Sequence, residues 1–160
     1  MTVQHRPLRV VLDTNVLVAI LVYDDPALEP LRAAWRDGAV MPLIDAACQG
    51  ELERVLDYPE LAARAQAARA SVSAFLAACE CVPDEAPGPD RLPICRDEDD
   101  QKFLMLASRG RADMLLTRDR LLLDLARSSP FPILAPEVLA SRIASATAPG
   151  HCVGRPRELG

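Results

Sequence analysis

Short runs of apolar residues alternate along the chain with segments in which apolar residues recur every three or four positions. The first run, residues 10–12, contains two β-branched residues and predicts a buried strand that ends at Leu12. Comparable runs predict strands at residues 39–41, 81–82, 114–117 and 132–134. Strands that alternate with helices favour an α/β fold, so we expect a mostly parallel sheet covered by helices on both faces.

Helical periodicity fills the segments between the predicted strands. Thr14 and Asn15 are helix-starting residues, so a first helix should begin one or two residues after Asp13 and continue to Val22. The longest later helix, at residues 60–78, should bend near residues 70–71. The other predicted helices cover residues 27–36, 46–56, 97–108, 121–126 and 137–144.

The length of 160 residues fits a single domain. We expect a flexible N-terminus at residues 1–7, one domain at residues 8–144 and a flexible C-terminal tail at residues 145–160, where Gly, Pro and Arg dominate. The longest apolar run, residues 16–22, is too short to span a bilayer, and residues 1–7 lack the apolar core of a signal peptide. We therefore expect a cytoplasmic protein that does not enter a membrane.

The net charge of −5 gives the chain no overall basic field that would attract nucleic acid. Lys102 is the only lysine, and we ascribe the preference for arginine mainly to genomic base composition. The five cysteines lack the spacing of a zinc site, and both histidines lie near the termini. Buried free thiols are therefore expected.

Two aspartates follow predicted strands. Asp13 comes directly after the first strand, and Asp119 comes shortly after the strand at residues 114–117. Open α/β sheets build their sites at the carboxyl ends of strands, which favours a functional interpretation. Each aspartate is also a suitable N-cap for the helix that follows it, and for Asp13 taken alone neither interpretation is preferred.

Glu51 is an acid on the buried side of a predicted helix. It lies four residues after Ala47 and four before Val55, both on the apolar stripe of the helix at residues 46–56. A glutamate on a buried stripe is costly unless it is paired or binds a metal. The alternative is that Glu51 sits at the edge of the stripe and pairs with an arginine.

Asp100 is a second inward-facing acid. It leads the apolar series of its helix, whereas Asp99 shares a face with Lys102 and should face solvent. The acids at residues 97–99 are explained by an N-cap and by the positive end of the helix dipole. Among the acids at the start of this helix, only Asp100 is a candidate site residue.

The four acids singled out in this way would converge if the two strands were neighbours and the two helices lay over their ends. They are Asp13, Glu51, Asp100 and Asp119. Clustered carboxylates raise one another's pKa values and oppose folding unless a cation lies among them. Oxygen ligands without inward His or Cys favour Mg²⁺ or Mn²⁺, and two such ions roughly 3.5–4 Å apart suit phosphodiester hydrolysis.

The chain resembles PIN-domain ribonucleases, most closely the bacterial branch of toxin components of toxin–antitoxin pairs (VapC-like). The matching segments are residues 11–17, 51–52, 95–104 and 112–119. The resemblance implies a three-layer α/β/α sandwich and a metal-dependent endoribonuclease that acts on single-stranded RNA. It also implies that the chain forms a homodimer and that a small antitoxin protein covers the site with its C-terminal segment.

The resemblance implies a role for each site residue. The catalytic acids would be Asp13, Glu51, Asp100 and Asp119. Three of them, the aspartates, would hold Mg²⁺ or Mn²⁺, directly or through water. Glu51 would bind metal or orient the attacking water, and Asn15 and Thr117 would steady the carboxylates or the substrate phosphate.

Leu121 departs from the family pattern, because relatives often carry a further acid at this position. This puts a second metal site in question and keeps open the alternative of a PIN-like module that binds RNA or protein without cleaving it. A phosphohydrolase with an aspartyl nucleophile is disfavoured because Asn15 stands where its second aspartate belongs. A receiver domain is disfavoured because Pro42, not an aspartate, follows the strand at residues 39–41.

Overall fold

A parallel sheet forms the centre of the fold in the computed structural model, which describes residues 5–88 and 91–148. In this part of the chain the strand order is β3-β2-β1-β4-β5, and every neighbouring pair is parallel. The strands are β1 (Leu8–Leu12), β2 (Val40–Ile44), β3 (Glu80–Cys81), β4 (Met114–Leu116) and β5 (Ile133–Leu134). The predicted α/β class with a mostly parallel sheet is confirmed.

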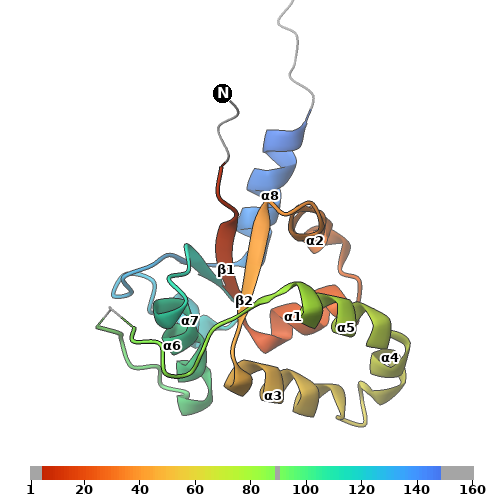
Figure 1. The fold of residues 1–160 in the computed structure, drawn as a ribbon, viewed down its shortest axis with the longest axis horizontal. Helices are drawn as coiled ribbons and strands as arrows, with labels where there is room; N and C mark the ends of the chain where they lie inside the picture. Colours follow the sequence, from red (N-terminus) through yellow and green to blue (C-terminus); the bar gives the residue numbers. More distant parts are fainter. Residues whose placement is uncertain (1–4, 89–90, 149–160) are drawn as a thin grey trace, which may run out of the picture.

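Helices cover both faces of this sheet (Figure 1). They are α1 (Thr14–Leu21), α2 (Glu29–Arg36), α3 (Ala46–Leu56), α4 (Ala62–Ala67), α5 (Arg69–Ala78), α6 (Gln101–Arg109), α7 (Arg120–Leu123) and α8 (Pro136–Thr147). Two short 3₁₀ helices, η1 (Pro26–Leu28) and η2 (Glu98–Asp100), precede α2 and α6. Figure 1 shows α6 and α7 on one side of the sheet, α1, α2 and α8 on the other, and α3 beyond the strand ends, where it contacts α1 and α6.

The core lies between the central strands and these helices. Val10 and Val11 of β1 are fully buried because helices pack on both faces of the strand, and this accounts for the unbroken apolar run in the sequence. Trp35 of α2 packs on Phe75 of α5 with ring centroids 5.1 Å apart, which ties α5 to the same face. Asp45 caps α3 by accepting the Cys48 N–H at 2.9 Å.

β2 is longer than its sequence predicts. The expected strand stops at Met41, but β2 continues through Pro42 to Ile44, with Pro42 opposite Val10 of β1. Proline is excluded from central strands because it cannot donate to the ladder. Here the other neighbour, β3, pairs only with the last two residues of β2, so a proline earlier in the strand is tolerated.

Several helix boundaries also differ from the predicted ones. The segment at residues 60–78 forms α4 and α5, which meet at Ala68, slightly before the expected bend. α8 ends at Thr147 and not at residue 144, since no helix-breaking residue intervenes. Of the N-terminus expected to be flexible, residues 5–7 have no regular structure, yet Arg6 pairs with Asp113 at 2.7 Å. Residues 1–4 and 149–160 lie outside the described residues, so those parts of the expectation stay predictions.

The cysteines are reduced in the part of the chain that the structure describes. Cys48 and Cys95 are the buried thiols expected from the sequence, whereas Cys79 is partly buried and Cys81 is exposed. Burial raises the pKa of Cys79 to about 12, so this thiol stays protonated. Cys152 lies outside the described residues.

None of the helices within residues 5–88 and 91–148 is long and apolar enough to cross a lipid bilayer. The most apolar helix is α1, which has only eight residues and is buried against the rest of the protein. A membrane span would require about 20 residues.

Candidate active site

Asp13 lies where β1 ends and α1 begins, on the central strand of the sheet. It is 4% exposed, and its Oδ1 accepts the backbone N–H of Val16 at 2.9 Å. Its Oδ2 accepts a hydrogen bond from the Thr117 hydroxyl. Asp13 is therefore both the N-cap of α1 and a buried carboxylate at a strand end, so the two interpretations of the sequence are compatible.

Thr117 connects the ends of the two neighbouring strands β1 and β4. The register of β4 with β1 places Thr117 beside Asp13. The same hydroxyl accepts the backbone N–H of Asp119 at 2.9 Å. Asp119 Oδ1 accepts the backbone N–H of Leu121 at 2.8 Å, so Asp119 caps α7 while it stands near Asp13.

Glu51 projects from α3 into the same region, with only 15% of its side chain exposed. Its Oε1 pairs with Lys102 Nζ at 2.7 Å, and its Oε2 accepts a hydrogen bond from the Thr14 hydroxyl. The nearest arginine partner, Arg54, is farther away at 3.9 Å. The close partner of Glu51 is therefore a lysine and not the arginine considered in the sequence analysis. Ala47, counted there on the buried stripe, is exposed.

Asp100 ends η2 and precedes α6, and it is partly buried. Asp99 beside it is exposed, as the helical phase predicts. Asp97 caps η2 by accepting the backbone N–H of Asp99 at 3.0 Å. Within the described part of the chain, the Asp100 carboxylate neither pairs with a cation nor accepts a hydrogen bond.

The pKa values indicate that the acids interact electrostatically. The pKa of Asp100 is raised to about 6, first by burial and then by the negative charges around it. Those charges belong, in decreasing order of effect, to Asp119, Asp97, Asp13 and Glu51. Burial also raises the pKa of Asp13, and hydrogen bonds from Thr117 and Val16 oppose this only in part. Because these effects act over short distances, the four acids share one region at the carboxyl edge of the sheet.

The donor chemistry of this region fits a hard divalent cation, because the acids offer only oxygen atoms and Asp100 has no neutralising partner. Asp13, Asp100 and Asp119 could hold such an ion. Across residues 5–88 and 91–148, however, no three His, Cys, Asp or Glu side chains are grouped closely enough to hold a metal as they stand. Ion binding would therefore require the carboxylates to draw together.

A family model described as a PIN domain matches residues 9–121, well over half of the chain. The chain belongs to the PIN-domain family. Its three-layer α/β/α arrangement around a parallel sheet is that of a PIN-like fold. PIN domains are generally nucleases, so the family implies a nucleic-acid substrate, and all four acids lie within the matched segment. No curated protein matches the chain in sequence.

Thr14 and Lys102 of this PIN domain contact Glu51, although their positions in the sequence predict no role in the site. Thr14 donates to Glu51, and Lys102, expected on a solvent face, is 20% exposed and pairs with Glu51. The available signals were that Thr14 adjoins Asp13 and that Lys102 is the only lysine. Asn15 is exposed and makes no hydrogen bond to the acids in the described part of the chain, and its role in steadying the carboxylates or the substrate phosphate stays a prediction.

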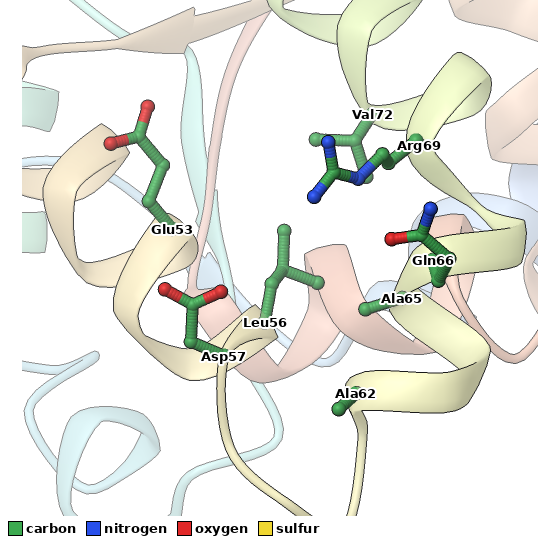
Figure 2. Close-up of a pocket in the computed structure, with 8 residues that line it drawn as sticks. All are labelled: Glu53, Leu56, Asp57, Ala62, Ala65, Gln66, Arg69 and Val72. Atoms are coloured by element: carbon green, nitrogen blue, oxygen red, sulfur yellow. The ribbon is translucent and has the colours of Figure 1, made fainter.

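A cleft of about 420 Å³ lies between α3 and the pair α4–α5 of this PIN domain (Figure 2). Figure 2 shows Leu56 pointing into the cleft from α3, with Arg69 reaching toward it from α5. Glu53 and Asp57 line its α3 side. None of the four acids lines this cleft, so it is separate from the candidate active site.

Proposed function

We propose that this PIN domain is a metal-dependent endoribonuclease that hydrolyses phosphodiester bonds in single-stranded RNA, with Mg²⁺ or Mn²⁺ as its cofactor. The observation that carries the proposal is the uncompensated charge of Asp100. This carboxylate is partly buried among other acids, its pKa is raised to about 6, and it has no partner in the described part of the chain. Such a charge opposes folding unless a cation is supplied from solution, and this supports a metal site.

In this proposal, the residues of the site have different roles in hydrolysis. The ion is held by Asp13, Asp100 and Asp119. The Thr117 hydroxyl keeps Asp13 and Asp119 side by side. A divalent ion, when bound, polarises water and neutralises charge on the phosphate. Glu51, held by donors on both of its oxygens, orients the attacking water.

The proposal is tested by cleavage of a fluorescently labelled single-stranded RNA in the presence of Mn²⁺. We expect Asp100→Asn to lower the rate by at least about 100-fold, because it removes a charged metal ligand, and EDTA to abolish cleavage. Asp99→Asn is the matched control, since Asp99 is the exposed neighbour at the same helix terminus. Equal losses in the two variants, or cleavage that persists in EDTA, would contradict the assignment.

A second candidate function is an RNA-binding or protein-binding module without nuclease activity. It is favoured by Leu121 at the position of the additional family acid and by the existing pairing of Glu51 with Lys102. The two functions differ in one measurement. RNA that binds equally well with and without Mn²⁺ and stays intact would support the binding module and exclude the nuclease.

We also propose that the protein is the toxin of a toxin–antitoxin pair in the cytoplasm, a homodimer whose site is covered by a small antitoxin. The support for this role is the sequence resemblance to that branch of the family. Expression of the chain should arrest growth of a bacterial host, and co-expression of a small protein encoded next to it should relieve the arrest. Arrest by Asp100→Asn as strong as that by the unmodified chain would contradict the role, and size-exclusion chromatography would test the dimer.

A further inference from the structure

Ile94 is the most exposed large apolar side chain in the described part of the chain, at 85%. It lies three residues before Asp97, in a segment without regular structure. The next residue, Cys95, is 3% exposed and belongs to the hydrophobic core. Single exposed apolar residues are common on protein surfaces, so the significance of Ile94 depends on how it is held and on what surrounds it.

The side chain of Gln101 fixes the backbone on both sides of Ile94. Gln101 Oε1 accepts the backbone N–H of Cys95 at 2.7 Å, and Gln101 Nε2 donates to the carbonyl oxygen of Pro93 at 3.1 Å. The ring of Pro93 restricts the backbone further. Because this backbone is already ordered, Ile94 would lose little conformational entropy when it contacts a ligand.

The segment that carries Ile94 lies beside the acids of the candidate active site. Gln101, which holds the segment, directly follows Asp100 at the start of α6. Burial raises the pKa of the Cys95 thiol, and the negative charges of Asp100 and Asp119 raise it further. Cys95 is therefore within electrostatic reach of the acids, and Ile94 stands next to the place where RNA would be cleaved.

Arg96 adds a positive charge to the same surface. It is exposed, and in the described part of the chain its guanidinium makes no ion pair or hydrogen bond. Acids follow it at residues 97–99, but the carboxylate of Asp97 caps η2 instead of pairing with Arg96. Ile94 and Arg96 lie on either side of buried Cys95, as alternate residues of an extended chain do, so both side chains face away from the core.

These two side chains together match the chemistry of a single-stranded nucleic acid. A guanidinium binds a phosphate through two N–H groups, and an ordered apolar side chain packs on the face of an unpaired base. In a duplex the base faces are covered by stacking, so only a single strand offers both groups. Two other cations of this region, Lys102 and Arg118, are already held by carboxylates, which leaves Arg96 as an available phosphate contact.

We propose that Ile94 and Arg96 bind the RNA strand next to the scissile phosphate, Ile94 by packing on an unpaired base and Arg96 by pairing with a backbone phosphate. This inference rests on the proposed function, since it takes single-stranded RNA to be the substrate, and it adds a binding surface outside the four acids. A second copy of the chain is the other occupant to consider for Ile94. It is disfavoured because one apolar side chain is small beside the area that a stable dimer interface buries.

The test is fluorescence anisotropy of a labelled single-stranded RNA of about 12 nucleotides, titrated with the full chain in EDTA to prevent metal-dependent cleavage. Arg96→Met removes one phosphate contact, so it should weaken binding and reduce the slope of log affinity against log salt by about 0.7. Ile94→Ser should weaken binding about threefold to tenfold and leave that slope unchanged, because no charge is lost. Circular dichroism confirms that each variant is folded.

Val138 and Arg142 provide a matched pair of controls. They lie four residues apart on α8, both are exposed, and Arg142 has no partner in the described part of the chain. Figure 1 shows α8 on the face of the sheet opposite to α6. Val138→Ser and Arg142→Met should therefore leave the RNA affinity within about twofold of that of the unmodified chain.

An oligonucleotide of the same length with abasic sites in place of its bases separates the two contacts. It keeps the phosphates, so Arg96→Met should still weaken its binding. It offers no base face, so Ile94→Ser should bind it as tightly as the unmodified chain does. A loss of affinity for the abasic strand in Ile94→Ser would contradict the base contact.

Other results would overturn the inference as a whole. These are no RNA binding by the unmodified chain in EDTA, unchanged binding in folded Ile94→Ser and Arg96→Met, or losses of the same size in the two α8 variants. A dimer in size-exclusion chromatography that Ile94→Ser converts to a monomer, with RNA binding unchanged, would assign Ile94 to an interface between copies instead.

Failure of this inference can be told apart from failure of the proposed function. Each of the results above would leave metal-dependent cleavage in Mn²⁺ standing. Conversely, RNA that stays intact in Mn²⁺ but binds less tightly to both Ile94→Ser and Arg96→Met would contradict the nuclease and retain the binding surface.

Discussion

Asp100→Asn should stabilise the metal-free protein near neutral pH. The substitution removes a carboxylate whose charge is opposed by burial and by Asp119, Asp97 and other acids. Asparagine is nearly the same size as aspartate and is equally compatible with the start of α6, so we expect the backbone to stay unchanged. The comparison must be made in EDTA, because a bound ion would reverse the sign of the effect.

The magnitude follows from the pKa of this group. The carboxyl has an ordinary pKa of 3.8 and titrates at about 6 in the folded protein. Because the pKa of Asp100 is higher in the folded protein than in the unfolded chain, protonation of this carboxyl stabilises the fold. This stabilisation is fully present below pH 3.8 and is lost as the pH rises through about 6. The difference between these two pKa values corresponds to a free energy of unfolding of at most about 3 kcal/mol. Because Asp100 is only partly buried, solvent screening reduces the expected effect to about 1 kcal/mol.

Urea denaturation followed by far-ultraviolet circular dichroism measures this effect. At about pH 7 in EDTA, the free energy of unfolding of Asp100→Asn should exceed that of Asp99→Asn by about 1 kcal/mol, and the difference should vanish near about pH 4. Asp99→Asn corrects for the loss of an acid at the same helix terminus, which costs about 0.3–1 kcal/mol in either variant. An Asp100→Asn variant that is no more stable than Asp99→Asn at neutral pH would refute the claim that Asp100 lies among like charges.

Two further substitutions test the framework that holds the site. Thr117→Val removes the hydroxyl that donates to buried Asp13, so it should lower the free energy of unfolding by about 1–3 kcal/mol. The loss should be larger at neutral pH than at acidic pH. A change below about 0.5 kcal/mol in urea denaturation would contradict this. Arg109→Met leaves the Asp45 carboxylate, 1% exposed, without its cation and should cost about 3–5 kcal/mol in the same assay. Arg36→Met, which breaks an exposed pair with Glu29, is its control and should change stability by less than about 1 kcal/mol.

Much of the fold could be predicted because local signals and burial agree. The β-branched run at Val10 and Val11 forms the central strand, and Asp97 and Asp119 each cap the helix that the sequence predicts after them. The outward orientation of Asp99 also followed from helical phase. These features depend on residues close together in sequence, so they can be inferred without coordinates.

Other features depend on contacts between distant residues. Lys102 was expected in solvent because the helical phase gives the direction of its Cβ, but its long side chain carries the ammonium across to Glu51 on another helix. The sequence predicts that a strand ends before Pro42, but the effect of this proline depends on the length of the neighbouring strand β3. The break at Ala68 has no proline or glycine to mark it, so tertiary packing alone sets its position.

The hydrogen bonds of the Thr117 hydroxyl make the side of the site at the strand ends more rigid than the side at the start of α6. Asp13 and Asp119 are joined through this one oxygen, and Asp13 is also fixed by its backbone bond to Leu116 at the end of the β1–β4 ladder. The Asp100 carboxylate accepts no hydrogen bond among the described residues, and Asp100 stands at the junction between a 3₁₀ turn and a helix. When the pocket contracts around a cation, the strand ends should stay still while the start of α6 moves toward them.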